Sequence, residues 1–196
     1  MSGSFAAVIA AAGLSSRMGE FKPLLPFAGT TVLRRCAENL LEAGARELAV
    51  VVGYRGAEAA AALDGLGVTV AENPDYASTQ MFDSLRIGLN ALRGSYDKLL
   101  LTPGDVPWVS PALIGALLSV EADFVCPLYG EKRGHPAALS ARCIPALRTY
   151  DGVGGLRGAV ETLGFSTAFV ETSELGVTLD LDTPEDYRRL LALAEK

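Results

Sequence analysis

The first 129 residues alternate short hydrophobic runs with segments of helical periodicity. The runs occupy residues 5–11, 47–53, 68–73, 98–105 and 123–129, and the helical patterns occupy residues 31–43, 57–63, 80–92 and 111–119. Runs without a polar residue at every second position are typical of parallel strands covered on both faces. Parallel neighbours need crossover connections, which the intervening helices supply. The sequence therefore predicts an α/β fold with three α/β/α layers around a mostly parallel sheet.

The pattern changes after Tyr129. Residues 130–141 indicate a turn and a short strand, and residues 167–171 and 177–183 indicate two further strands. A closing helix is predicted over residues 184–195, with Thr183 as its N-cap. Ser110 is predicted to be the N-cap of the helix at residues 111–119. The second half should thus extend the same sheet with partly antiparallel strands, making it mixed. Because no linker or repeat interrupts the chain, we expect one domain over residues 1–196.

Composition narrows the function classes. The net charge is −6, no basic block is present and aromatic residues make up 7%, which argues against nucleic-acid binding. No apolar run is long enough for a membrane span, and the N-terminus lacks the basic leader of a signal peptide. Cys36, Cys126 and Cys143 are far apart and odd in number, so we expect reduced core thiols in a cytoplasmic protein.

A long loop follows the first predicted strand. It combines residue types that suit an anion site: Gly13, Ser15, Ser16, Arg17, Gly19 and Lys22. Glycines let the backbone approach a ligand closely, successive N–H groups form an anion-binding concavity, and the two cations supply charge. We interpret the loop as a phosphate cradle whose cations are exposed without ligand; the alternative is a solvated surface turn. Neither GxxxxGK[ST] nor GxGxxG is present.

Three aspartates are placed to complete a site with this loop. Asp105 follows the buried run 98–105, while Asp180 and Asp182 alternate along a predicted strand and should share one face. Ligands of open α/β sheets bind beyond the carboxyl ends of the strands. We therefore expect loop 12–22, residues 103–108 and the segment near Asp180 to meet at one rim.

The loop also carries a family signature. Residues 11–26 follow the pattern A-A-G-x-S-x-R-M-G-x-x-K-x-L-L-P, which resembles the nucleotidyltransferases that share a GT-A-like, Rossmann-like fold. The chain looks most like the molybdenum cofactor cytidylyltransferase branch (MobA/MocA type). The resemblance continues through NPDY (73–76), SLRIGL (84–89), PGDVP (103–107), GHPAALS (134–140) and DLDTPEDY (180–187).

The resemblance implies roles for individual residues. It implies that the loop wraps a nucleoside triphosphate, with Arg17, Lys22 and Asp105 as catalytic residues. The implied nucleotide-binding residues are Ala11, Ala12, Gly13, Ser15, Ser16, Arg17, Gly19, Lys22, Ser84, Pro103, Gly104 and Asp105. Phosphoryl transfer of this kind uses a divalent cation, and Mg²⁺ takes one or two carboxylates plus substrate oxygens. Asp105 is the implied ligand, completed by Asp180 or Asp182.

The acceptor side is expected in the second half of the chain. The resemblance points to Arg133 and His135, and GGLRG (154–158) adds Arg157 at a helix start that could bind an anion or be a plain turn. Residues 1–129 would then form the nucleotide-binding half, residues 130–182 the acceptor-side extension and residues 183–196 the closing helix.

One segment departs from the branch. Relatives typically carry Gly-Met and two or three serines before Leu-Arg, whereas this chain has Gln80, Phe82 and Asp83 in place of small residues, with Ser84 retained. Met81 and Leu85, four residues apart, are predicted to lie in the core. The departure bears on which nucleotide or acceptor is used.

The sequence favours transfer of CMP from CTP to molybdopterin, with Mg²⁺ as cofactor, release of pyrophosphate and a molybdoenzyme as partner protein. Ala12 supports CTP because guanylyl-transferring relatives typically carry glycine there. The alternatives are a cytidylyl-, guanylyl- or uridylyltransferase for another phosphorylated acceptor, a non-catalytic nucleotide-binding protein that delivers cofactor, and an oxidoreductase, a label that some relatives carry. No nucleic-acid or membrane partner is expected.

Overall fold

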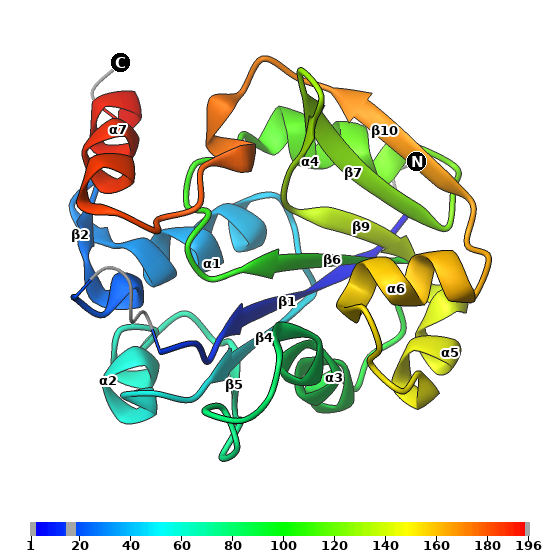
Figure 1. The fold of residues 1–196 in the computed structure, drawn as a ribbon, viewed down its shortest axis with the longest axis horizontal. Coiled ribbons are helices and arrows are strands. Elements are labelled where there is room, and N and C mark those ends of the chain that lie inside the picture. Colours follow the sequence, from blue (N-terminus) through cyan, green and yellow to red (C-terminus); the bar gives the residue numbers. More distant parts are fainter. Residues whose placement is uncertain (1–2, 15–18, 195–196) are drawn as a thin grey trace.

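A mixed sheet forms the centre of the molecule. The computed structural model describes residues 3–14 and 19–194, and in that part of the chain the sheet has eight strands between two helical layers (Figure 1). The strands are β1 (Phe5–Ala11), β4 (Glu47–Val52), β5 (Thr69–Glu72), β6 (Lys98–Pro103), β7 (Phe124–Tyr129), β8 (Lys132–Arg133), β9 (Ala137–Ser140) and β10 (Thr167–Glu171). Their order is β10-β7-β9-β6-β1-β4-β5, with β8 paired to β7.

Strands β6, β1, β4 and β5 lie side by side in this order, each parallel to its neighbours, and β10 is parallel to β7. Strand β9 is antiparallel to both β6 and β7 and joins the two parallel sets. The predicted α/β class with a mixed, mostly parallel sheet is therefore confirmed. Because β1, β4 and β6 run in the same direction, the loops that follow them leave the sheet at one edge.

Helices cover both faces of the sheet. The buried side chains of α1 (Val32–Glu42), α2 (Gly56–Ala61), α4 (Pro111–Ser119) and α7 (Pro184–Ala194) join one core cluster, and those of α3 (Met81–Ala91), α5 (Ile144–Thr149) and α6 (Gly155–Thr162) join the other. Strand β1 divides its side chains between the two: Phe5 and Ile9 enter the first cluster, whereas Ala6 and Val8 enter the second. This alternation explains why the strand is hydrophobic throughout.

Most predicted elements are present, and Ser110 and Thr183 cap α4 and α7 by accepting backbone N–H groups of Leu113 and Asp186. The prediction of a strand at residues 177–183 is wrong. A 3-10 turn, Leu175–Thr178, lies there, and residues 179–182 have no regular structure. The carbonyl of Val177 accepts the N–H of His135 at 2.8 Å, so this segment bonds to a loop instead of a strand. Helix α5 and the β2–β3 hairpin (Pro26–Phe27 and Thr30–Thr31) were not predicted.

Cys36, Cys126 and Cys143 are buried free thiols, as expected. Burial raises the pKa of Cys143 to about 12, and its thiol donates to Asp123. In the described ranges no helix is long and apolar enough to cross a membrane.

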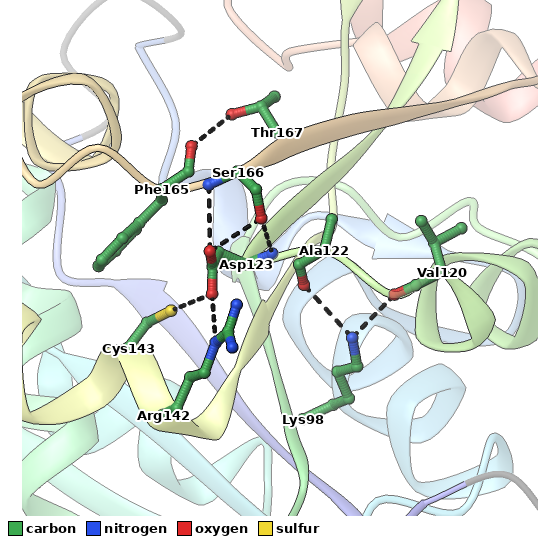
Figure 2. A network of polar contacts seen from close by, with 9 residues as sticks. All are labelled: Lys98, Val120, Ala122, Asp123, Arg142, Cys143, Phe165, Ser166 and Thr167. Carbon is green, nitrogen blue, oxygen red and sulfur yellow. Dashed lines mark hydrogen bonds and ion pairs between the residues drawn. The ribbon is translucent and has the colours of Figure 1, made fainter.

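A polar network joins segments at the edge of the sheet away from the rim (Figure 2). The Asp123 carboxylate, just before β7, accepts hydrogen bonds from Arg142 Nε at 2.7 Å and from the Ser166 N–H at 3.1 Å and hydroxyl at 2.8 Å. Nearby, the buried Lys98 donates to the carbonyls of Val120 at 2.8 Å and Ala122 at 3.4 Å after α4. The network fixes the starts of β7 and β10 beside one another.

Replacing Asp123 by alanine should therefore lower the free energy of unfolding by roughly 2 kcal/mol, since hydrogen bonds to a charged group are lost. The Arg142 hydrogen bond, followed by those from Ser166 and Cys143, holds the pKa of Asp123 well below its ordinary value. The ionised Asp123 carboxylate should therefore stabilise the fold fully above about pH 4, the pKa of a free aspartate. This stabilisation should be lost progressively as the pH falls from there toward the lower pKa of Asp123 in the folded protein. Urea unfolding at pH 7 and pH 3, with the exposed Asp64→Ala as control, tests this. Equal stability of both variants at pH 7 would contradict it.

Candidate functional site

A cavity lies at the carboxyl ends of β1 and β6, against the first turn of α3. We call it the first cavity; it is lined by Ala10, Ala11, Ala12, Gly13, Lys22, Pro23, Tyr76, Thr79, Gln80, Met81, Ser84, Pro103, Gly104 and Asp105. The A-A-G residues, Lys22, Ser84 and the P-G-D turn, which the sequence analysis singled out, are thus brought together.

Some of the candidate residues lie elsewhere. Gly19, with φ of +71°, lines a neighbouring hollow with Phe21, Tyr54 and Arg55 and not the first cavity. Ser15, Ser16 and Arg17 lie outside the described residues. Conversely, Ala10, Pro23, Tyr76, Thr79, Gln80 and Met81 line the first cavity without having been proposed as site residues. For Tyr76 a signal was present, since it ends the NPDY motif.

Close packing of two strand ends shapes the floor of the first cavity. The Gly104 N–H donates to the Ala10 carbonyl at 2.9 Å, and a Cβ on Gly104 would lie 2.7 Å from that of Ala11. Only glycine permits this approach without displacing β1. It brings the following residue, Asp105, beside the end of the first strand.

Lys22 connects two of the predicted carboxylates. Its Nζ lies 2.8 Å from Asp182 Oδ1 and 3.4 Å from Asp105 Oδ2. The Lys22 side chain is 13% exposed, so the expectation of an exposed cation was wrong for this residue. The 3-10 turn Lys22–Leu24 and the buried Pro23 hold it against the rim, where the acidic groups offset its burial.

The acidic groups influence one another. Burial raises the pKa of Asp105 above its ordinary value; Lys22 opposes this shift, and the charges of Asp180 and Asp182 add to it. Asp180 and Asp182 do not share one face of a strand, because no strand forms there. The Asp182 carboxylate forms an ion pair with Lys22, whereas Asp180 is exposed. Lys22 at the end of the loop, Asp105 in the 103–105 turn and Asp182 do meet at one rim.

Ser84 occupies a buried position on α3. Its hydroxyl accepts a hydrogen bond from Asn73 Nδ2 at 3.1 Å, and the same Nδ2 donates to Thr79 Oγ1 at 2.9 Å. Asn73 Oδ1 accepts the Asp75 N–H at 3.1 Å. This side-chain network fixes the turn between β5 and α3 and so the far wall of the first cavity.

A second cavity of about 680 Å³ adjoins the first. It is lined by Gln80, Met81, Phe82, Leu85, Phe124, Cys126, Arg133, Gly134, His135, Ala137, Gly154, Gly155, Leu156, Arg157, Val160, Glu161, Thr167 and Phe169. The candidate acceptor residues Arg133, His135 and Arg157 are all among them. Gln80 and Met81 line both cavities, so the two adjoin at the start of α3.

Met81 is 48% exposed, so its expected core position was wrong, whereas Leu85 is buried. The first residue of α3 cannot enter the core because the helix begins at the junction of the two cavities.

The polar groups of the second cavity differ in burial. His135 Nδ1 is buried and has no hydrogen-bond partner within the described ranges, and burial lowers the pKa of this histidine against an opposing effect of Asp180. The Arg133 guanidinium carbon lies 5.0 Å from the Phe169 ring centroid. Arg157 is 77% exposed and pairs with Glu161 at 3.0 Å. The lining thus combines two cations on exposed residues with a histidine whose Nδ1 is enclosed.

Among the described residues, no group of three or more His, Cys, Asp or Glu side chains is arranged to hold a metal ion. A site here would be limited to one or two protein carboxylates. That is the donor set that Mg²⁺ accepts when substrate oxygens and waters fill its other positions.

Comparison with known proteins identifies relatives over nearly the whole chain. A family model described as the MobA-like NTP transferase domain matches residues 7–167. The chain is 31% identical over 182 residues to the molybdenum cofactor cytidylyltransferase of Escherichia coli (strain K12), covering 92% of each protein. It is 28% identical over 195 residues to the nicotine blue oxidoreductase of Paenarthrobacter nicotinovorans, covering 94% of this chain and 95% of that protein.

Solved structures with the same fold match nearly the whole chain. A nucleotidyl transferase from Methanothermobacter superposes with a TM-score of 0.84 at 29% identity, covering 98% of both chains. The 2-C-methyl-D-erythritol 4-phosphate cytidylyltransferase of Thermus thermophilus has a TM-score of 0.76 at 22% identity, covering 98% of this chain and all of that one. The latter likeness concerns the fold alone.

Proposed function

The chain belongs to the family of MobA-like NTP transferases and is a nucleotidyltransferase, and from this premise we propose that it transfers CMP from CTP to molybdopterin and releases pyrophosphate. The observation that carries the proposal is the junction of two cavities at Gln80 and Met81, with Lys22 and Asp105 in the wall of the first. A donor in the first cavity and an acceptor in the second would meet beside these charged groups.

Lys22 has the chemistry to stabilise the transferring phosphates. Its ammonium group is held in advance by Asp105 and Asp182, so little reorganisation is needed when a triphosphate arrives. Positive charge at this point offsets the negative charge that develops as an acceptor phosphate attacks the α-phosphorus and pyrophosphate leaves. Arg17 is proposed to add a second cation, and Gly13, which lines the first cavity, is proposed to give the loop backbone access to phosphate oxygens.

The acidic rim fits Mg²⁺. Asp105 and Asp182 contact the Lys22 ammonium group, and burial raises the pKa of Asp105, with the charges of Asp180 and Asp182 adding to the shift and Lys22 opposing it. We propose that Asp105 and Asp180 would hold the ion, because Asp182 makes the shorter contact with Lys22, 2.8 Å against 3.4 Å for Asp105. When bound, Mg²⁺ would neutralise phosphate charge and help to orient the triphosphate.

The two acidic neighbours should accordingly behave differently. Asp180→Asn should weaken Mg²⁺-dependent CTP binding by about tenfold or more, because changing even an outer-shell partner of a metal costs about tenfold to one hundredfold and Asp180 is proposed as a direct ligand. Asp182→Asn should leave Mg²⁺ dependence in place and lower kcat instead, because Lys22 loses a partner that holds it. Titration of CTP at several Mg²⁺ concentrations separates the two. The reverse assignment of effects would transfer the metal role to Asp182.

Base preference is proposed to depend on Ala12. This residue is 5% exposed at the end of β1, and its carbonyl accepts the Tyr54 N–H at 3.3 Å, so its methyl group lies on a fixed wall of the first cavity. A methyl group there narrows the space for a purine. Groups that read cytosine would also be left unpaired by uracil, which costs about 1–3 kcal/mol per buried group.

Ala12→Gly should therefore improve GTP binding by about tenfold while changing CTP binding much less, since one methyl group in a pocket is worth that much discrimination. Competition binding of the two nucleotides with Mg²⁺ measures the ratio. Gly13→Ala, which adds a methyl group next to this position, serves as the opposite control and should weaken both nucleotides. An unchanged GTP-to-CTP ratio in Ala12→Gly would contradict the assignment of base choice to this residue.

The function itself is tested with a nucleotide panel. CTP with Mg²⁺ should stabilise the protein more than UTP or GTP, by about 2.7 kcal/mol at one hundred times its Kd. Pyrophosphate release should require CTP, Mg²⁺ and molybdopterin together. Strong CTP binding without release would favour a delivery protein, and greater stabilisation by GTP would favour guanylyl transfer. Turnover of a nicotinamide cofactor would favour the oxidoreductase.

The proposed product also implies its surroundings. A cytidylylated molybdenum cofactor is used by a molybdoenzyme, so we propose such an enzyme as partner protein and the cytoplasm as the place of action. Co-purification of a molybdoenzyme with the tagged protein, with and without CTP, tests this.

A further inference from the structure

The inner wall of the second cavity is apolar. Phe82 and Leu85 come from α3, Phe124 and Cys126 from β7, and Ala137 from β9. The charged groups Arg133 and Arg157 belong to exposed residues. A ligand that fills this cavity would therefore place its apolar part inward and its anionic part outward.

Within this wall, Phe82 connects α3 to the turn before α6. Its side chain is 3% exposed, and its ring meets the Tyr150 ring edge-to-face, with 5.8 Å between centroids and 88° between planes. The Arg86 guanidinium carbon lies 5.8 Å from the Phe82 centroid. A Cβ on Gly152 would be 3.7 Å from Phe82 Cδ1, so the ring also packs close to the turn before α6.

The contacts of Phe82 continue into that turn. The Tyr150 hydroxyl donates to the Val153 carbonyl at 2.6 Å, and Arg86 donates to the Tyr150 carbonyl at 3.1 Å while pairing with Asp83 at 2.8 Å. Phe82 and Asp83, the two residues that replace small side chains in this segment, thus both contribute to the link between α3 and the 150–155 turn. The turn leads directly into α6, which supplies Leu156, Arg157 and Val160 to the second cavity.

We propose that Phe82 determines acceptor specificity: its ring forms the inner wall and, through Tyr150, sets the position of the α6 wall, so that the cavity selects a flat ring system carrying an anionic group. The inference rests on the proposed function in taking the second cavity as the acceptor site. A flat ring gains contact with Phe82 and Leu85, and the arginines meet the anion. An open-chain polyol phosphate would leave its hydroxyl groups unpaired against the apolar wall.

The test uses pterin-6-carboxylate, a fluorescent flat ring with one carboxylate, and methylerythritol phosphate as the open-chain comparison. The wild-type protein should bind the first in preference to the second. Phe82→Leu should weaken pterin-6-carboxylate binding by about tenfold, since removing part of a pocket wall has effects of that size. Affinity for CTP with Mg²⁺ should change by less than about twofold, a small difference in binding free energy. Phe5→Leu is the matched control: it is equally buried, at 4% exposed, but lies in the other core cluster and should change neither affinity.

Tyr150→Phe provides a second variant if Phe82→Leu does not fold. It keeps the edge-to-face ring contact, removes the bond to Val153 and does not line the cavity, so a weakening of pterin-6-carboxylate binding by about threefold, with CTP binding kept, would show positioning through the turn. A folded Phe82→Leu variant that binds the probe like the wild type, or loses CTP binding equally, would overturn the inference. So would a wild-type protein that does not bind pterin-6-carboxylate. Because binding is measured without turnover, a protein that binds the probe but releases no pyrophosphate would contradict the proposed function and leave the inference standing.

Discussion

Replacing Lys22 by alanine is expected to lower kcat by about two to three orders of magnitude, the scale seen when one preorganised charge stabiliser is removed. The ammonium group lies within 3.4 Å of Asp105 and 2.8 Å of Asp182, and it lines the first cavity. Its loss removes positive charge from the proposed phosphate site and leaves the two carboxylates to repel both each other and the nucleotide. Steady-state pyrophosphate release measures the effect.

Two controls accompany this variant. Lys22→Gln keeps the length of the side chain without the charge and should be nearly as inactive, whereas Lys132→Ala, on the exposed strand β8, should be unaffected. Thermal unfolding of each variant separates loss of chemistry from loss of fold, since Lys22 is mostly buried. Near-normal turnover by a folded Lys22→Ala variant would remove the lysine from the proposed mechanism.

Asp105→Asn is expected to have the second large effect. The change keeps the shape of the side chain but removes the charge that a hard cation requires. Mg²⁺-dependent CTP binding should weaken by about one hundredfold, at the upper end of effects on metal affinity, and turnover should fall in parallel. CTP binding without Mg²⁺ should be unchanged or improved, because one negative charge has left the rim.

The stability of Asp105→Asn supplies an independent check. Burial raises the pKa of Asp105, which means that the folded protein binds this proton more tightly than the unfolded chain does. The ionised carboxylate therefore lowers stability as the pH rises through that range, and asparagine should leave the nucleotide-free protein equally or more stable at pH 7. The exposed Asp64→Asn serves as control. Unaltered Mg²⁺ dependence in Asp105→Asn would show that other groups hold the ion.

Local patterns predicted most of the fold. Strand β1 was predicted with its observed bounds because its hydrophobic side chains serve both core clusters, and α4 because Ser110 and Pro111 mark its first turn. Helix α5 was missed because its six residues show too little periodicity for detection. The segment 177–183 alternates like a strand, yet its backbone bonds to the 134–135 loop, a long-range contact that no local pattern reports.

Local sequence patterns were enough to predict the α/β class and the family signature, because strand ends, a long signature loop and a following aspartate occur in a fixed order along the chain. They also pointed to part of the first-cavity lining, namely the A-A-G residues, Lys22, Ser84 and the P-G-D turn. The sequence does not show that Lys22 is buried between Asp105 and Asp182, that Met81 lies at the junction of two cavities, or that Phe82 connects α3 to the turn before α6. The physical reason is distance along the chain. Residues 22, 105 and 182, like residues 82 and 150, become neighbours only when the sheet brings separate loops to one edge and the helices pack on its faces, and side-chain burial and pairing follow from that assembly.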